Sequence, residues 1–156
     1  MSVCLSQLDP RWSSKKIGRS FLSIGRFGCT VTSLSMALAD FGIYMTPSDI
    51  ADHDDWFTDR GLILWKNVEE GLQGSYPSKT ISLTRYYGRN DVLIRESLSP
   101  GTGVLLEVAN KSHWIKADRK ALLRNDYVCR DPWTGEECMA IGDYRNITGF
   151  ALLKIS

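Results

Sequence analysis

The chain has 156 residues, of which 43% are hydrophobic, and this is enough to bury the core of one domain. Its 19 basic and 18 acidic residues leave a formal net charge of +1 without a basic cluster, which argues against a nucleic-acid-binding protein. No apolar run approaches the roughly 20 residues of a membrane-spanning helix, and the first residues lack the basic and apolar regions of a signal peptide.

The first part of the chain is predicted to be mainly helical. Residues 1–28 contain one Pro and three Gly residues and are expected to be irregular. A helix is predicted over about 29–40, because apolar residues from Val31 to Leu38 recur at helical spacing and Gly42 follows as a stop. Further helices are expected after Thr46, with Pro47 and Asp49 in the first turn, around residues 64–72, and over 91–98 with Asn90 as the cap.

The residue pattern changes after Gly103. Short runs rich in β-branched and aromatic residues alternate with turn sequences such as NKS and PWTG, which indicates strands joined in antiparallel pairs. We therefore predict an α+β fold in one domain over residues 1–156, with a helical part over about 1–98 and a sheet part over about 99–156. The expected strands are residues 103–109, 113–118, 126–131, 137–141 and 149–155.

Four cysteines, Cys4, Cys29, Cys129 and Cys138, show no zinc-type spacing, and free thiols in a reducing compartment are favoured. Cys129 and Cys138 face each other if their strands form a hairpin, so a disulfide between them stays open. Cys29 follows Gly28 at the start of a predicted helix, where unpaired N–H groups favour a thiolate. Because Gly28 has no side chain, the backbone of another chain has room to approach. Cys29 is therefore the candidate nucleophile.

A nucleophilic cysteine needs a base, normally histidine, and the chain has two. His53 lies among acidic residues in ADHDDWF, where a solvated surface is favoured over a metal site. His113 begins a predicted strand in KSHWIKAD and is the better base by position. A structural role for His113 stays open at this point.

Asp131 is the candidate third member, which would orient the imidazole by accepting a hydrogen bond from Nδ1. If strands 113–118 and 126–131 pair antiparallel, the start of one meets the end of the other, and Asp131 becomes the neighbour of His113. Asp118, the rival carboxylate, lies at the opposite end of its strand from His113 and is disfavoured.

The motifs SQLDPRW, GRSFLSIGRFGCTVTSLSMAL, a late HW and the later DPWTG together resemble the bacteriocin-processing, double-glycine peptidase-like group, cysteine-peptidase family thirty-nine of the papain-like superfamily. The resemblance implies a papain-like fold, in which the helix that carries the Cys packs on the antiparallel sheet that carries the His and Asp. It implies that Cys29 is the nucleophile and His113 the general base and acid. Asp131 becomes the orienting carboxylate, and Gln7 takes the place of the oxyanion-hole glutamine.

Two features depart from that pattern. Gln7 lies 22 residues before Cys29, a longer gap than is typical of papain and the transporter-linked peptidases. The strand after His113 reads WIKADRK instead of a hydrophobic, glycine-ended run, so Lys116 is expected to be exposed on an edge or to line the cleft.

The resemblance implies hydrolysis of a peptide or amide bond through an acyl-thioester on Cys29, without a metal or another cofactor. Stand-alone domains of this kind occur in bacterial and bacteriophage proteins, so a cytoplasmic or phage-particle-associated protein is expected. The expected partner is a peptide or protein, including peptidoglycan cross-bridge peptides, and neither nucleic acid nor a membrane. A non-catalytic papain-like module, for example a phage particle component, and an acyltransferase on the same scaffold stay open as alternatives.

Overall fold

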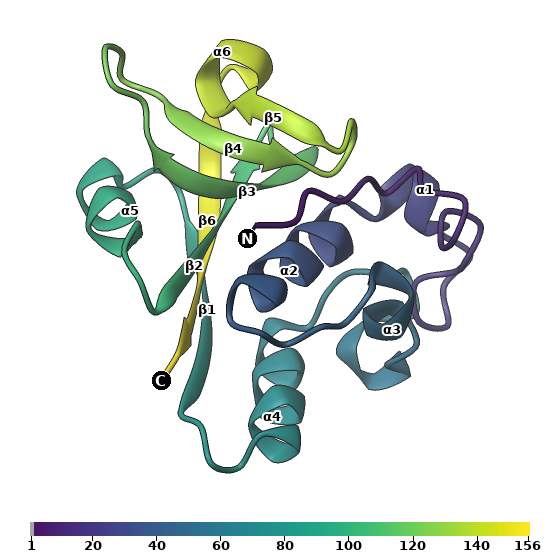
Figure 1. Cartoon of the computed structure of the whole chain (residues 1–156). Coiled ribbons are helices and arrows are strands. Elements are labelled where there is room, and N and C mark those ends of the chain that lie inside the picture. Colours follow the sequence, from purple (N-terminus) through teal and green to yellow (C-terminus); the bar gives the residue numbers. More distant parts are fainter. Residues whose placement is uncertain (1) are drawn as a thin grey trace.

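The computed structural model describes residues 2–156 and contains one six-stranded sheet with helices packed on both faces (Figure 1). All neighbouring strands are antiparallel, in the order β1-β6-β2-β3-β4-β5. The predicted α+β class is confirmed. Among the residues described, no helix combines the length and the hydropathy needed to cross a membrane. The strands are β1 (Ile81–Tyr87), β2 (Thr102–Val108), β3 (His113–Lys120), β4 (Tyr127–Asp131), β5 (Glu136–Met139) and β6 (Ile147–Ile155).

Most predicted helices are present. The helix that begins at Cys29 ends at Asp40, and Gly42 adopts the left-handed conformation (φ 77°) that ends it. Thr46 forms a capping box with Asp49, and Asn90 accepts a hydrogen bond from the Leu93 N–H. The helices are α1 (Ile24–Phe27), α2 (Cys29–Asp40), α3 (Pro47–Ala51), α4 (Trp65–Ser75), α5 (Asp91–Ser97) and α6 (Ala140–Tyr144), with one 3-10 turn, η1 (Asp54–Trp56).

The prediction that residues 1–98 are helical is wrong at β1. This strand pairs with β6 along its whole length, and it buries Ile81 and Leu83 against the helices. Its sequence, ISLTRYY, has the β-branched and aromatic residues typical of a strand. The pairing partner lies more than 60 residues later in the chain, so no neighbouring strand in the sequence indicated the pairing.

The predicted strand over residues 137–141 is also partly wrong, because the chain turns into α6 at Ala140. The carboxylate of Asp126 accepts hydrogen bonds from the backbone N–H groups of Ile141 and Gly142, both at 2.8 Å. A carboxylate at these first N–H groups stabilises the start of a helix. Because Asp126 is remote in sequence, the local pattern did not reveal the helix.

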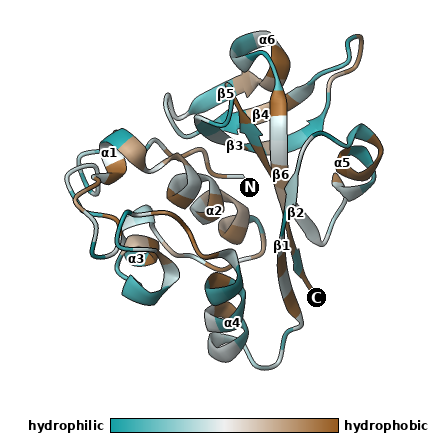
Figure 2. Cartoon of the chain, turned by 180° about the vertical axis from the view of Figure 1, so that it is seen from behind, coloured by the Kyte–Doolittle hydropathy of each residue, from teal (hydrophilic) through white to brown (hydrophobic). Residues whose placement is uncertain are grey.

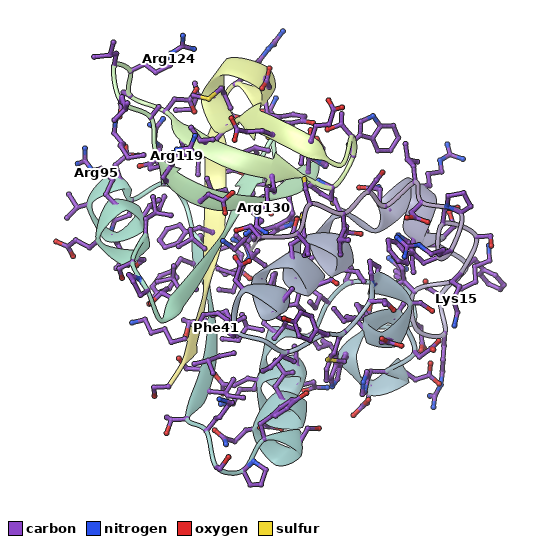
Figure 3. The ribbon with its side chains drawn as sticks, in the orientation of Figure 1. Lys15, Phe41, Arg95, Arg119, Arg124 and Arg130 are labelled. Carbon is purple, nitrogen blue, oxygen red and sulfur yellow. The ribbon has the colours of Figure 1, made fainter. Side chains whose placement is uncertain are left out.

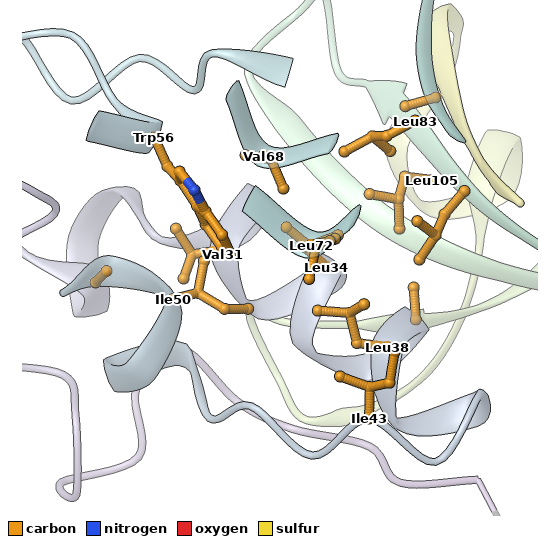
Figure 4. Packing of buried hydrophobic residues seen from close by; sticks show 14 of the residues in the cluster. Val31, Leu34, Leu38, Ile43, Ile50, Trp56, Val68, Leu72, Leu83 and Leu105 are labelled. Carbon is orange, nitrogen blue, oxygen red and sulfur yellow. The ribbon is translucent and has the colours of Figure 1, made fainter. Parts of the chain in front are cut away.

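The core lies on both faces of the sheet, as β2 shows. Leu105 packs in the cluster that contains Leu34 and Leu38 of α2, whereas Val104 and Leu106 belong to the cluster on the opposite face. Figure 4 shows the first cluster between α2, α4 and the sheet, and Figure 2 shows the hydrophobic residues on these elements. This packing fixes α2, and hence Cys29 at its start, against the strands that carry the other candidate residues.

A largely buried ionic cluster joins the far end of α2 to strands β3 and β4, and Figure 3 labels its central residue, Arg130. The Nε of Arg130 in β4 donates to both carboxylate oxygens of Asp118, each at 3.1 Å. The Nη2 of Arg130 donates to the carboxylate of Asp40. Lys116 is only 5% exposed, and its Nζ donates to the Ala117 carbonyl at 2.7 Å and lies 3.5 Å from Asp40. The prediction that Lys116 is edge-exposed or lines the cleft of Cys29 is therefore wrong, because these acceptors bind it inside the protein.

Candidate active site

Cys29 is the first residue of α2 and is half-buried. It lines a cavity of about 510 Å³ whose walls are mainly apolar and aromatic, with Trp65 and Trp114 among them. The two tryptophan rings pack together at a centroid distance of 5.2 Å. A thiol at the first turn of a helix, next to an accessible cavity, has the position that a nucleophile requires.

Gly28 fits tightly between α1 and α2. A Cβ at this position would lie 2.4 Å from the carbonyl oxygen of Ile24 and 2.6 Å from its Cγ2. The space beside Gly28 is thus filled by Ile24 of the same chain, not open to another chain as the sequence suggested. The glycine lets the short α1 turn end directly against the start of α2 and so determines where Cys29 lies.

We expect Gly28→Ala to lower the free energy of unfolding by about 1–3 kcal/mol, because the added methyl group forces α1 away from α2. Urea denaturation measures this loss. Gly74→Ala is the matched control, since no atom lies within 4 Å of a Cβ at Gly74 of α4 and alanine favours helix. Equal stability of the two variants would show that the contact with Ile24 is not restrictive.

His113 lies between Cys29 and Asp131. Its Nε2 donates to Oδ1 of Asp131 at 2.9 Å, and Cys29 is among the neighbouring groups that raise its pKa. The predicted antiparallel pairing is confirmed, since Lys116 of β3 is opposite Arg130 of β4. The prediction that Nδ1 would bond Asp131 is wrong: Nε2 makes that bond, so Nδ1 is the ring nitrogen that does not bond the carboxylate.

Asp131 is held by more than the imidazole. Its Oδ1 also accepts from the backbone N–H of Trp133 at 2.9 Å, and its Oδ2 accepts from the hydroxyl of Tyr144. Burial raises the pKa of Asp131, but the hydrogen bonds from His113, Tyr144 and Trp133 outweigh it and lower the pKa below its ordinary value. The group is therefore an anion at neutral pH, which suits a partner for an imidazolium.

The same contacts act on His113 in the opposite direction. Burial lowers the pKa of His113, but the hydrogen bonds to Asp131 and Cys29 outweigh it and raise the pKa to about 9. Protonated His113 thus stabilises the fold fully below about pH 6.5, and this contribution is lost as the pH rises from 6.5 to about 9.

We expect the ring resonances of His113 to titrate with a midpoint near pH 9 in NMR spectra of histidine-labelled protein. Asp131→Asn should lower this midpoint, because it removes a negative charge that favours the imidazolium. The His53→Gln variant assigns the two histidines. A wild-type midpoint at or below 6.5, the ordinary value, would contradict the contacts described for His113.

Gln7 reaches the site although 22 residues separate it from Cys29. Its backbone N–H donates to the carbonyl of Pro132 at 2.6 Å, next to Asp131, and its Nε2 donates to the carbonyl of Gly25 at 3.2 Å. Gln7 is 2% exposed, and its Oε1 has no hydrogen-bond partner within residues 2–156. The N-terminal segment therefore passes between the turn after β4 and the α1 turn that precedes Cys29.

The long gap between Gln7 and Cys29 forms a loop that returns on itself. The indole N–H of Trp12 donates to the carbonyl of Ser6 at 2.8 Å, and the backbone N–H of Gly25 donates to the carbonyl of Ser13. Trp12 is 3% exposed, as expected for a tryptophan packed under a turn. The extra residues thus add a loop without moving Gln7 away from α1.

Two other candidates lie outside the site. Asp118, the rival carboxylate, bonds Arg130 instead of His113. His53 stacks on Trp56, with ring centroids 3.9 Å apart and planes 8° from parallel. Among the described residues, no group of three or more His, Cys, Asp or Glu side chains is arranged to hold a metal ion.

The other cysteines are also separate from the site. Cys129 and Cys138 are directly opposite each other on β4 and β5, as expected for a hairpin, and both are free thiols. Burial is the main cause that raises the pKa of Cys129 well above its ordinary value, and the neighbouring Cys138 adds to it. Cys129 is therefore a poor nucleophile. Cys4 is an exposed free thiol.

Comparison with known proteins supports the fold. No protein-family model matches the sequence, and no curated protein matches it. One similar solved structure is a double-glycine motif protease from an AMS/PCAT transporter, crystallised in complex with the leader peptide. The two chains superpose with a TM-score of 0.58 over 94% of this chain and 96% of that chain, at 13% sequence identity. The fold is therefore that of the double-glycine peptidases, as the sequence motifs implied.

Proposed function

We propose that the protein is a cysteine peptidase that hydrolyses a peptide or amide bond through an acyl-thioester on Cys29. The observation that carries this proposal is the position of His113. Its Nε2 bonds Asp131, and Cys29 is the other neighbouring group that raises its pKa. A cysteine, a histidine and a carboxylate in this order have the arrangement that activates a thiol. The shared fold with a double-glycine protease supports the proposal.

In the first step, the sulfur of Cys29 attacks the substrate carbonyl carbon, and the carbonyl π electrons move to the oxygen. His113, as imidazolium, then donates its Nδ1 proton to the leaving amine while the C–N bond breaks and the thioester forms. Neutral His113 next removes a proton from water, which attacks the thioester. Collapse of the second tetrahedral species breaks the C–S bond, and the product acid leaves with the Cys29 thiolate and the His113 imidazolium restored.

Two groups are proposed to stabilise the negative oxygen in both steps. The backbone N–H of Cys29 belongs to the first turn of α2, where helix N–H groups lack partners within the helix. Gln7 lies against the α1 turn just before it, with one Nε2 hydrogen used by Gly25 and a second available. One such donor typically contributes about 3 kcal/mol to transition-state stabilisation.

The cavity beside Cys29 suits a peptide with apolar side chains. Phe57, Leu62, Trp65 and Trp114 line it, and two of its three charged lining residues are paired, since Arg85 donates to Glu107 at 2.9 Å. Two peptide classes follow for testing. Leader peptides are suggested by the complex of the similar protease, and peptidoglycan cross-bridge peptides by the resemblance to bacterial and phage proteins.

Mass spectrometry of digests tests the function, with synthetic peptides that contain a Gly-Gly leader sequence or a cross-bridge sequence. We expect cleavage by the wild type and none by Cys29→Ala. An added ordinary amine such as glycinamide separates the reactions, since a transferase would form an amide product in place of the acid. Uncleaved peptides, together with a Cys29 that iodoacetamide labels no faster than Cys4, would indicate a binding module on the peptidase fold.

A further inference from the structure

Tyr144, at the end of α6, contacts both His113 and Asp131, the two residues proposed to act with Cys29. Its hydroxyl donates to Oδ2 of Asp131, the oxygen that His113 does not use. Its ring packs against the imidazole of His113, with centroids 4.8 Å apart and planes inclined by 43°. The tyrosine therefore restricts the rotation of the Asp131 carboxylate and also packs against one face of the His113 imidazole.

The backbone around Tyr144 also holds the turn that leads into His113. Ala109, Asn110 and Lys111 follow one another in the left-handed region, with φ of 52°, 52° and 69°. Non-glycine residues adopt this conformation at a cost, and a run of three needs support from its surroundings. The turn connects β2 to β3, so its conformation determines where β3 begins and where its first residue, His113, lies.

The supporting contacts come from residues 144–146. The backbone N–H of Ala109 donates to the carbonyl of Tyr144 at 3.2 Å, and that of Asn110 donates to Oδ1 of Asn146 at 3.1 Å. Asn146 donates in return from Nδ2 to Oδ1 of Asn110 at 2.8 Å. One short segment thus binds the turn before His113 and the carboxylate that bonds His113.

This segment is itself fixed to the sheet. The Asp126 carboxylate accepts the first N–H groups of α6, and Asp143 accepts from the backbone N–H of Met139 at 2.7 Å. Arg145, the next residue, is again left-handed with φ of 75°. Residues 144–146 therefore have little freedom to follow a displaced His113 or Asp131, and instead keep both in position.

We propose that Tyr144 is a positioning residue, which orients Asp131 and His113 so that Nδ1 faces Cys29. The inference rests on the proposed function and adds to it a residue that touches neither the substrate nor the sulfur. Without the hydroxyl, the carboxylate rotates more freely, and the imidazolium beside Cys29 loses orientation. The consequence is a less reactive sulfur and slower chemistry, with substrate binding unchanged.

Iodoacetamide labelling of Cys29 between pH 5 and 9 tests the inference without a substrate. We expect Tyr144→Phe, which keeps the ring, to slow labelling at pH 6.5 about tenfold and to shift the profile to higher pH. Where a peptide is cleaved, kcat should fall by a similar factor while KM is unchanged. The matched control is Tyr127→Phe, which removes the hydrogen bond from Tyr127 to Asp91, 2.6 Å long, at the opposite end of β4.

The outcomes separate the two proposals. If labelling is the same in wild type and His113→Ala, the proposed function and this inference both fail. If His113→Ala slows labelling but Tyr144→Phe behaves like wild type or like Tyr127→Phe, this inference alone fails. Should Tyr144→Phe not fold, Asn146→Ala replaces it, since Asn146 is exposed and its loss frees the turn before His113. Labelling by Asn146→Ala at the wild-type rate would then overturn the inference.

Discussion

Replacing His113 with alanine is expected to lower kcat/KM for peptide hydrolysis about 10⁴-fold. The variant loses the group that bonds Asp131 and Cys29, and with it the proton donor for the leaving amine. Activity that remains comes from binding and from the oxyanion donors, which His113→Ala leaves in place. Initial rates measured by mass spectrometry over a range of peptide concentrations give this ratio.

The double variant Cys29→Ala/His113→Ala is the control for this prediction. Because the two side chains act as one unit, it should be no slower than either single variant. If the two losses multiply instead, the residues act independently. A His113→Ala variant that retains a tenth or more of the wild-type activity would contradict the role proposed for the imidazole.

The largest expected effect on stability is at Arg130. We expect Arg130→Met to lower the free energy of unfolding by about 3 kcal/mol, because it leaves Asp118 and Asp40 without their principal cation. The value lies at the lower end for a broken buried pair, since these carboxylates are about one quarter exposed. Urea denaturation at pH 7 measures the change.

Arg119→Met is the matched control for Arg130→Met. Arg119 is 63% exposed and lies 3.8 Å from Glu137, so its loss should cost less than about 1 kcal/mol. The contrast should also depend on salt, since exposed pairs are screened more than buried ones. A loss at Arg130 no greater than that at Arg119 would mean that the buried cluster contributes little to stability.

Three of the residues that meet in the site could be predicted because each has a local signal. Cys29 follows a glycine at the start of an amphipathic helix, and His113 and Asp131 occupy opposite ends of two strands that a short connection joins. Antiparallel pairing is enough to bring such ends together. The orientation of the imidazole ring is not predictable in this way, since either ring nitrogen can face the carboxylate.

Other features depend on contacts between distant segments. No local signal in the sequence indicates the role of Tyr144. The start of α6 is stabilised by the distant Asp126 carboxylate, and the Tyr144 hydroxyl bonds Asp131, which belongs to another element. Lys116 interrupts an apolar strand, which favours an exposed edge or a place in the cleft, but Asp40 at the end of α2 lies 3.5 Å from its buried ammonium group. Gln7 was placed by motif alone, and the loop that returns the chain to α1 was not visible.

The measurement that tests the account most directly is the pH dependence of Cys29 labelling by iodoacetamide, in wild type and His113→Ala, followed by peptide mass spectrometry. Cys4, an exposed free thiol whose pKa is raised mainly by partial burial, is followed in the same sample as a thiol that is not activated. We predict that Cys29 reacts well below pH 7, faster than Cys4, and that His113→Ala abolishes this reactivity. Labelling that rises only near pH 8.5, as for an ordinary thiol, and is the same in both proteins would contradict the proposed Cys29–His113 pair.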